Sequence, residues 1–315
     1  MKTPTRVYKY RTFSSWTLQL MVEDRLWFAD PSTFNDPLDV QPTVYEDISS
    51  TELERILRKM VERRVGGELH ATARAIRQSG AAPLDHIAEL ARKSADDLLA
   101  QARYRIASLD RPDGDEARDL LGGYVLQEVL HRYDHGIVSM ATRANCPLMW
   151  SHYGDQHNGV CIGYSVPESV RLAPVAYGGS RSIKASLIRD MVDGDPAATR
   201  AVDDAVLLTK AGDWRYEREW RLIGDMGLQD CPLEMEELVF GLRCPPIVRF
   251  SLATALANRK PAIKLYEIQQ KRDSFVLRKV RTKVDDLLAA WPRRARSALE
   301  DMGDAAAAQL LAAER

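Results

Sequence analysis

The segments Ile137-Val138-Ser139-Met140 and Val160-Cys161-Ile162-Gly163-Tyr164 mark the point where strand-type sequence returns after a long helix-type stretch. Both are short, apolar and rich in branched residues, which is typical of buried strands. The first part of the chain has the same character, with alternating aromatic and branched residues at Val7–Arg11. We therefore expect the strands to come from two separate parts of the chain, residues 1–45 and 136–280.

The block between these parts, about residues 46–135, has a different pattern. Apolar residues recur every three or four positions from Leu53 to Val61, and again over 84–109 and 117–133. This spacing predicts helices with one buried face. Gly66-Gly67 is expected to end the first of them, because glycine is unfavourable inside a helix. The block therefore reads as a helical insertion between two strand-rich parts.

Together these patterns predict an α+β fold. We expect a twisted, mostly antiparallel split sheet from residues 1–45 and 136–280, interrupted by the helical insertion and closed by C-terminal helices. Residues 1–280 would form a single domain, and residues 281–315 a helical extension that Pro292 divides.

Composition excludes several classes of protein. Lys plus Arg is 44 and Asp plus Glu is 45, so the chain is not a polyanion-coating protein. No apolar stretch is long enough to span a membrane, and the N-terminal residues lack the apolar stretch of a secretion signal. The four cysteines are widely spaced without a CxxC pair, which favours neither a metal site nor disulfides. We expect a cytoplasmic protein without a membrane partner.

The segment Met149–Val160 carries the densest group of polar aromatic residues. It holds Trp150, His152, Tyr153 and His157 and ends at an apolar strand, as loop-borne sites often do. The alternative is a turn in which Trp150 and Tyr153 fill the core while His157 faces water.

A second candidate segment runs from Trp214 to Arg221. Glu217 and Glu219 are two residues apart, so in an extended chain both side chains would point to the same face. Paired carboxylates can divide acid–base work or stabilise a developing cation. The alternative is a solvated edge strand of alternating Glu and Arg pairs, each worth little.

Four short segments of the chain, taken in their order, indicate a family resemblance. They are Tyr8-Lys9-Tyr10-Arg11, Phe34-Asn35-Asp36-Pro37, Met149–Tyr153 with His157-Asn158-Gly159, and Lys210 with Trp214–Arg221. In this order they resemble a bacterial family catalogued as domain of unknown function 2971, over about residues 7–243. More distantly, the order of elements is similar to that of ADP-ribosyltransferases. These have a basic residue on the first strand, a polar aromatic motif in mid-chain and a late Glu that begins a strand.

The second resemblance implies an NAD-consuming enzyme, a transferase or NAD glycohydrolase, with NAD as substrate and an unknown macromolecular acceptor, protein or nucleic acid. It further suggests a bacterial toxin or anti-phage effector. Glu219 would be the catalytic carboxylate that stabilises the oxocarbenium-like state, and Glu217 would orient the acceptor. The NAD-binding residues would be Tyr10, Arg11, Asn35, Trp150, His152 and Tyr153.

Two other functions stay open from the sequence. Residues 271–296 contain nine Lys or Arg and three Asp, so this segment could bind nucleic acid without catalysis. A nuclease could instead use His152, His157 and the Glu217/Glu219 pair. His131 and His135 have a spacing compatible with metal ligands, but without a third ligand they favour core or capping roles, and we predict no metal site.

Overall fold

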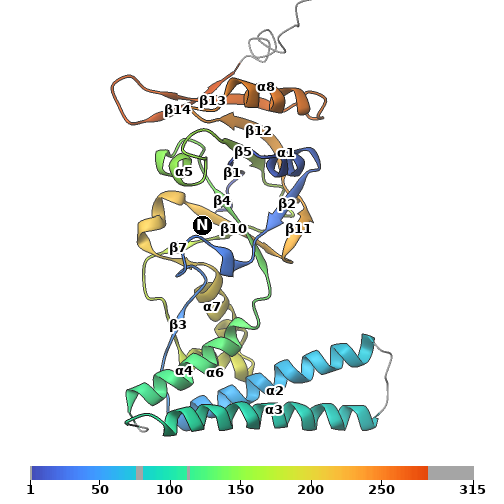
Figure 1. The fold of residues 1–315 in the computed structure, drawn as a ribbon, viewed down its shortest axis with the longest axis vertical. Coiled ribbons are helices and arrows are strands. Elements are labelled where there is room, and N and C mark those ends of the chain that lie inside the picture. The colour runs from blue at the N-terminus through green and yellow to red at the C-terminus, as the bar shows by residue number, and fades with distance from the viewer. Residues whose placement is uncertain (1, 76–80, 112–113, 283–315) are drawn as a thin grey trace, which may run out of the picture. The chain divides into compact units, whose positions relative to one another are not determined.

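The computed structural model describes residues 2–75, 81–111 and 114–282, which divide into two compact units. The first unit comprises Met1–Lys9, Asp24–Arg143 and Ser165–Glu234, and the second comprises Tyr10–Glu23, Ala144–Tyr164 and Met235–Arg315. Both units combine helices with strands (Figure 1), which confirms the α+β class. The predicted C-terminal helices from residue 283 onward lie outside the described residues.

The sheet of the first unit has the strand order β1-β4-β10-β6. These strands are β1 (Arg6–Arg11, of which Arg6–Lys9 belong to this unit), β4 (Gly136–Ala141), β10 (Glu219–Gly224) and β6 (Ala173–Pro174). All three pairings are antiparallel, and Tyr8 and Glu219 both pair with Ala141. The first residue of β10 therefore lies level with Tyr8, two strands away.

Short two-stranded pairs complete the strands of the first unit. They are antiparallel β2 (Arg25–Phe28) with β11 (Gly227–Asp230), parallel β3 (Thr43–Tyr45) with β8 (Ser182–Lys184), and parallel β7 (Ala176–Tyr177) with β9 (Thr209–Lys210). Four of these six pairings are antiparallel and two are parallel, so the strand arrangement is mixed, with antiparallel pairs in the majority. Strands β6 and β7 are separate because the Val175 amide donates to Glu219 O of β10 at 3.1 Å, whereas the next amide, Ala176, donates to Leu208 O beside β9 at 2.7 Å.

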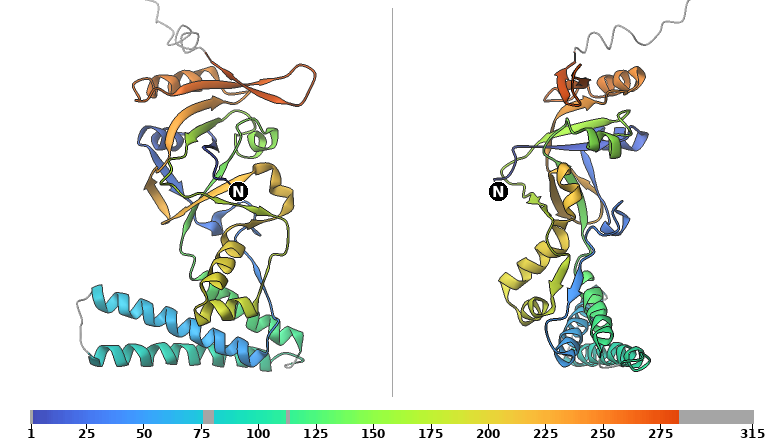
Figure 2. Two further views of the ribbon diagram at one scale, coloured as in Figure 1. Left: turned by 180° about the vertical axis from the view of Figure 1, so that it is seen from behind. Right: turned by 90° about the vertical axis from the view of Figure 1, so that its left-hand side faces the viewer.

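The helical insertion consists of α2 (Ser50–Ala75), α3 (Ala81–Ala107) and α4 (Asp115–Leu130). Helices α2 and α3 run side by side in both Figure 1 and Figure 2 and contact each other along their length. Their buried residues share one apolar core with α6 (Ala185–Asp193) and α7 (Pro196–Leu207). The insertion is therefore built into the first unit, through residues such as Leu57, Val125 and Val202.

The break predicted at Gly66-Gly67 is wrong, because α2 continues through both glycines. A Cβ built on Gly66 would lie 3.9 Å from Ala91 Cβ of α3, so the two helices approach closely there. Packing against a partner helix outweighs the propensity cost of glycine, which is about 1 kcal/mol per residue.

The second unit contains strands in the order β14-β13-β12-β5, with α1 (Ser15–Val22), α5 (Pro147–His152) and α8 (Pro246–Ala255). The strands are β14 (Leu277–Arg281), β13 (Lys264–Gln270), β12 (Glu234–Phe240) and β5 (Val160–Ser165). Strands β12 and β13 are parallel, and α8 supplies the crossover that a parallel pair requires. Ser14 caps α1, accepting from Thr17 N–H at 3.1 Å. Within the described ranges, no helix is long and apolar enough to cross a membrane.

Two glycine-to-alanine substitutions are expected to have opposite effects on stability. Gly67→Ala places a methyl group in open space on a helix, so the free energy of unfolding should rise by about 1 kcal/mol. In Gly159→Ala the methyl group would collide with Arg11 O and lie 2.9 Å from Gly154 O, so unfolding should become easier by about 1–3 kcal/mol. Urea denaturation of both variants measures the difference. A Gly159→Ala protein as stable as wild type would contradict this packing.

Candidate active site

The segment from Lys210 to Arg221 forms the centre of the candidate site. Lys210 ends β9, and the chain then makes the 3₁₀ helix η2 (Gly212–Glu217) before β10 begins at Glu219. Arg218 between them has φ +49°, a left-handed conformation. The sequence predicted that Glu217 and Glu219 share a face by strand alternation. Their carboxylates do converge, but the end of a helix and a left-handed residue bring them together.

Both carboxylates bind the ammonium group of Lys210. Lys210 Nζ lies 2.7 Å from Glu217 Oε2 and 3.1 Å from Glu219 Oε2. It also lies 3.3 Å from Asp39 Oδ2. One lysine therefore holds three acidic residues together.

Arg221 completes this buried ion cluster, which we define as Asp39, Lys210, Glu217, Glu219 and Arg221. Arg221 Nε donates to Glu219 Oε1 at 2.8 Å, and Nη2 donates to both Asp39 oxygens at 2.8 Å. Its Nη1 donates to the backbone oxygen of Leu207 at 2.6 Å. All five side chains are buried, and Arg221 is fully inaccessible. A solvated edge strand, the alternative considered from the sequence, therefore does not describe this segment.

Opposite charges keep the cluster ionised in spite of its burial. Burial opposes ionisation of Glu219, but Arg221 and Lys210 outweigh it and lower its pKa to about 2. For Lys210, burial disfavours the charged form, yet Glu219, Glu217 and Asp39 raise its pKa above the ordinary value. Three carboxylates face two cations, so the ionised cluster carries one net negative charge.

The loop Phe34-Asn35-Asp36-Pro37 lies against the same segment. Trp214 Nε1 donates to Asp36 Oδ2 at 2.7 Å, and the Phe34 ring lies 5.8 Å from Arg221 Cζ. Trp214 in turn lies 5.2 Å from Lys210 Nζ. Two of the four sequence motifs are thus brought together around the ion cluster. Asn35, predicted to bind NAD, is an exposed residue of this loop.

A pocket of about 610 Å³ opens beside the start of β10. Its lining includes the first residue of that strand, Glu219, and Tyr177, whose hydroxyl accepts from Glu219 N–H at 2.6 Å. The remaining charged and aromatic residues of its wall are Arg143, Arg215, Arg218, Tyr216 and Trp220. Three arginines and three aromatic residues thus line a pocket to which Glu219 also contributes, a combination suited to an anionic ligand with flat rings.

The mid-chain motif belongs to the second unit. Trp150 of α5 is fully buried, and its indole N–H donates to Ala144 O at 2.8 Å. Tyr10, also buried, meets the Trp150 ring edge-on at 5.1 Å, and His157 stacks on it at 6.1 Å. Trp150 thus has the core role that the sequence allowed as an alternative, with Tyr10 packed beside it.

The other residues predicted from the resemblance are more accessible. His152, at the end of α5, is exposed, and Tyr153 is half-buried, with the two rings 6.2 Å apart. Burial lowers the pKa of Arg11, which lies at the end of β1. Glu217, Glu219 and Asn35 thus belong to the first unit, and Tyr10, Arg11, Trp150, His152 and Tyr153 to the second. A role for the second group in NAD binding stays a prediction.

Sequence reasoning missed Asp39 and gave no role to Lys210 or Arg221. One signal was available. Arg221 stands between Trp220 and Leu222 in a strand that is otherwise apolar, and Lys210 follows the apolar end of a helix. A cation in a buried strand requires carboxylate partners.

The basic segment and the histidines give the alternative functions no added support. Of the basic segment 271–296, residues 283–296 lie outside the described residues. In the described part, Lys279 pairs with the buried Glu237 at 2.6 Å. Among the described residues, no group of three or more His, Cys, Asp or Glu side chains could hold a metal ion.

The geometry therefore defines a mixed α+β protein with a buried ion cluster beside an arginine-rich pocket. Residues 149–222 match the family model described as "Protein of unknown function (DUF2971)", which confirms the family resemblance over this part of the predicted range 7–243. The matched region includes both the Trp150 motif and the segment from Lys210 to Arg221. Neither a curated protein nor a solved structure matches the chain.

Proposed function

We propose that this protein is an NAD-consuming enzyme of the ADP-ribosyltransferase type, either a transferase or an NAD glycohydrolase. The observation that supports it most is the 610 Å³ pocket, whose lining combines Glu219 with three arginines and three aromatic residues. Guanidinium groups bind phosphate oxygens through paired hydrogen bonds, and aromatic side chains pack against flat rings. A dinucleotide with a pyrophosphate and two ring systems has the chemistry that this lining would recognise.

In this proposal Glu219 stabilises the positive charge that develops on the ribose as nicotinamide leaves. A fixed negative charge near the reacting carbon lowers the barrier, because the carboxylate is already oriented before reaction. The ion cluster supports this role, since Arg221 and Lys210 hold Glu219 ionised while one net negative charge remains. The attacking group would be water in a glycohydrolase, or a nucleophile of a macromolecular acceptor in a transferase.

Glu217 has a positioning role in the same proposal. The resemblance assigns it to the acceptor, but its carboxylate binds Lys210 and it does not line the pocket. It would hold Lys210 in place and so fix the orientation of Glu219. A toxin or anti-phage role would follow from the consumption of NAD or from modification of a host component.

NAD binding by the purified chain tests this proposal. We expect saturable binding by isothermal titration calorimetry, and Arg218→Gln, which removes a pocket guanidinium, should weaken it about tenfold or more. Arg181→Gln is the matched control, because Arg181 is exposed and does not line the pocket. A folded wild-type protein that does not bind NAD at all would overturn the proposal.

A further inference from the structure

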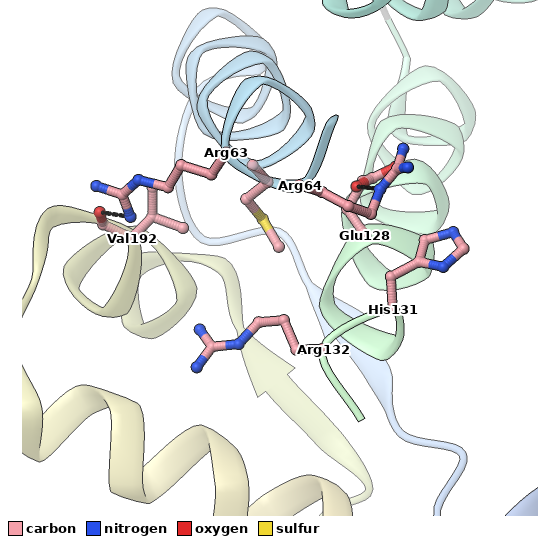
Figure 3. A pocket seen from close by; sticks show the side chains of 7 residues that line it. Arg63, Arg64, Glu128, His131, Arg132 and Val192 are labelled. Carbon is pink, nitrogen blue, oxygen red and sulfur yellow. Dashed lines mark hydrogen bonds and ion pairs between the residues drawn. The ribbon is translucent and has the colours of Figure 1, made fainter. Parts of the chain in front are cut away.

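A second pocket of the first unit lies in the helical insertion, where α2, α4 and α6 meet (Figure 3). Its volume is about 310 Å³, at the small end of the range for ligand pockets. Its charged lining consists of Arg63, Arg64, Arg132 and a single carboxylate, Glu128. The pocket is therefore rich in positive charge.

One of these arginines is already neutralised. Arg64 Nε donates to Glu128 Oε2 at 2.8 Å, and Nη2 donates to Oε1 at 3.0 Å. Glu128 is buried, and this paired contact raises the pKa of Arg64. Arg64 and Glu128 thus form a fixed, charge-balanced wall of the pocket.

The other two arginines have only neutral acceptors. Arg63 Nη1 donates to Val192 O at 2.6 Å, and Arg132 Nη1 donates to Met191 Sδ at 2.8 Å. A thioether sulfur is a weak acceptor. In the part of the chain that the structure describes, no carboxylate lies within ion-pair distance of either guanidinium group. Figure 3 shows Arg63 extending from α2, and Arg132 from the segment after α4, toward α6.

Neighbouring arginines on the same helices do not share this property. Arg55 and Arg58 of α2 contact Asp193 and Asp96 at 3.1 and 2.6 Å, and Arg118 of α4 contacts Asp115 at 2.9 Å. Several arginines on these helices are thus ion-paired. Arg63 of α2 and Arg132, two residues after α4, have no carboxylate partner among the described residues, and both line the same pocket.

We propose that this pocket binds a small phosphate monoester, with Arg63 and Arg132 donating to the phosphoryl oxygens. A phosphate monoester carries nearly two negative charges at neutral pH, which would balance both guanidinium groups. Both guanidinium groups already donate to consecutive residues of α6, Met191 and Val192. Little side-chain conformational entropy is therefore lost when the ligand binds. His131, exposed beside them, supplies a further donor at the rim.

The apolar part of the lining favours a monoester over the free anion. Met60 and Val192 line the pocket together with the arginines. They offer apolar contact to the organic group of the ligand, which inorganic phosphate lacks. This inference is independent of NAD consumption, because it concerns a different pocket.

Titration of the full chain with phenyl phosphate at fixed ionic strength tests the inference. We expect saturable binding that Arg63→Gln and Arg132→Gln each weaken about tenfold or more. Arg132→Lys keeps the positive charge but loses the planar, two-pronged guanidinium group, so it should weaken phenyl phosphate binding less than Arg132→Gln does. Arg118→Gln, the control on α4 outside the pocket, should bind like wild type. Thermal melting verifies that every variant is folded.

Three comparison ligands separate the sources of binding. Inorganic phosphate should bind more weakly than phenyl phosphate if the apolar contact contributes. NAD binding should respond to Arg218→Gln and not to Arg132→Gln, which separates the two pockets. The inference is overturned if phenyl phosphate shows no saturable binding, or if neither Arg63→Gln nor Arg132→Gln weakens that binding. It is also overturned if a single-stranded oligonucleotide binds these arginines and phenyl phosphate does not.

Discussion

Replacement of Glu219 with glutamine is expected to slow nicotinamide release from NAD by about 10²–10³-fold. Glutamine keeps the size and one acceptor oxygen of the side chain but removes its negative charge. The fold should survive, because Asp39 and Glu217 then balance Lys210 and Arg221 within the cluster. The loss of charge-assisted hydrogen bonds should lower the free energy of unfolding by about 1–3 kcal/mol.

The matched control for this experiment is Glu217→Gln. It removes the same charge from the same buried cluster, but Glu217 does not line the 610 Å³ pocket. We expect a similar loss of stability and a much smaller effect on nicotinamide release, because Glu217 acts on Glu219 only through Lys210. Release assays on wild type and both variants, with urea denaturation in parallel, give the comparison. Equal release by wild type and Glu219→Gln would refute the catalytic role of Glu219.

Helix periodicity was the most informative feature of the sequence. The apolar spacing from Leu53 to Val61 predicted the buried face of α2, and the same reasoning located α3 and α4 to within a few residues. Periodicity could not predict where α2 ends, because the packing of α3 against Gly66 decides whether the helix continues there. Such a contact is tertiary, and local propensity does not contain it.

The candidate site shows the same division between local and long-range information. The sequence placed Glu217 and Glu219 together, because their separation is local. It did not reveal Asp39, which binds Arg221 from 182 residues earlier in the chain. Nor did it reveal the left-handed Arg218 that turns both glutamates toward Lys210, because only glycine and asparagine commonly signal that conformation.

The ion cluster should also be the most sensitive point for stability. Lys210→Met removes the cation that three carboxylates share and leaves Glu217 buried with its ion pair broken. Loss of one partner of a buried ion pair typically costs 3–5 kcal/mol, and we expect a decrease of about that size in the free energy of unfolding. Lys59→Met is the control, because Lys59 forms an exposed pair with Asp193 at 2.8 Å, worth less than about 1 kcal/mol.

A second substitution and a change of pH distinguish loss of charge balance from loss of packing. Adding Glu217→Gln to Lys210→Met returns the cluster to its original net charge of minus one, so the double variant should recover part of the lost stability.

In wild type, the lowered pKa of Glu219 contributes stability above about pH 4.5 that is lost as the pH falls toward about 2. Without Lys210 this pKa is less depressed, so stability should depend less steeply on pH in that range. Urea denaturation at several acidic pH values measures both effects, and a double variant no more stable than Lys210→Met would show that packing, not charge, accounts for the loss.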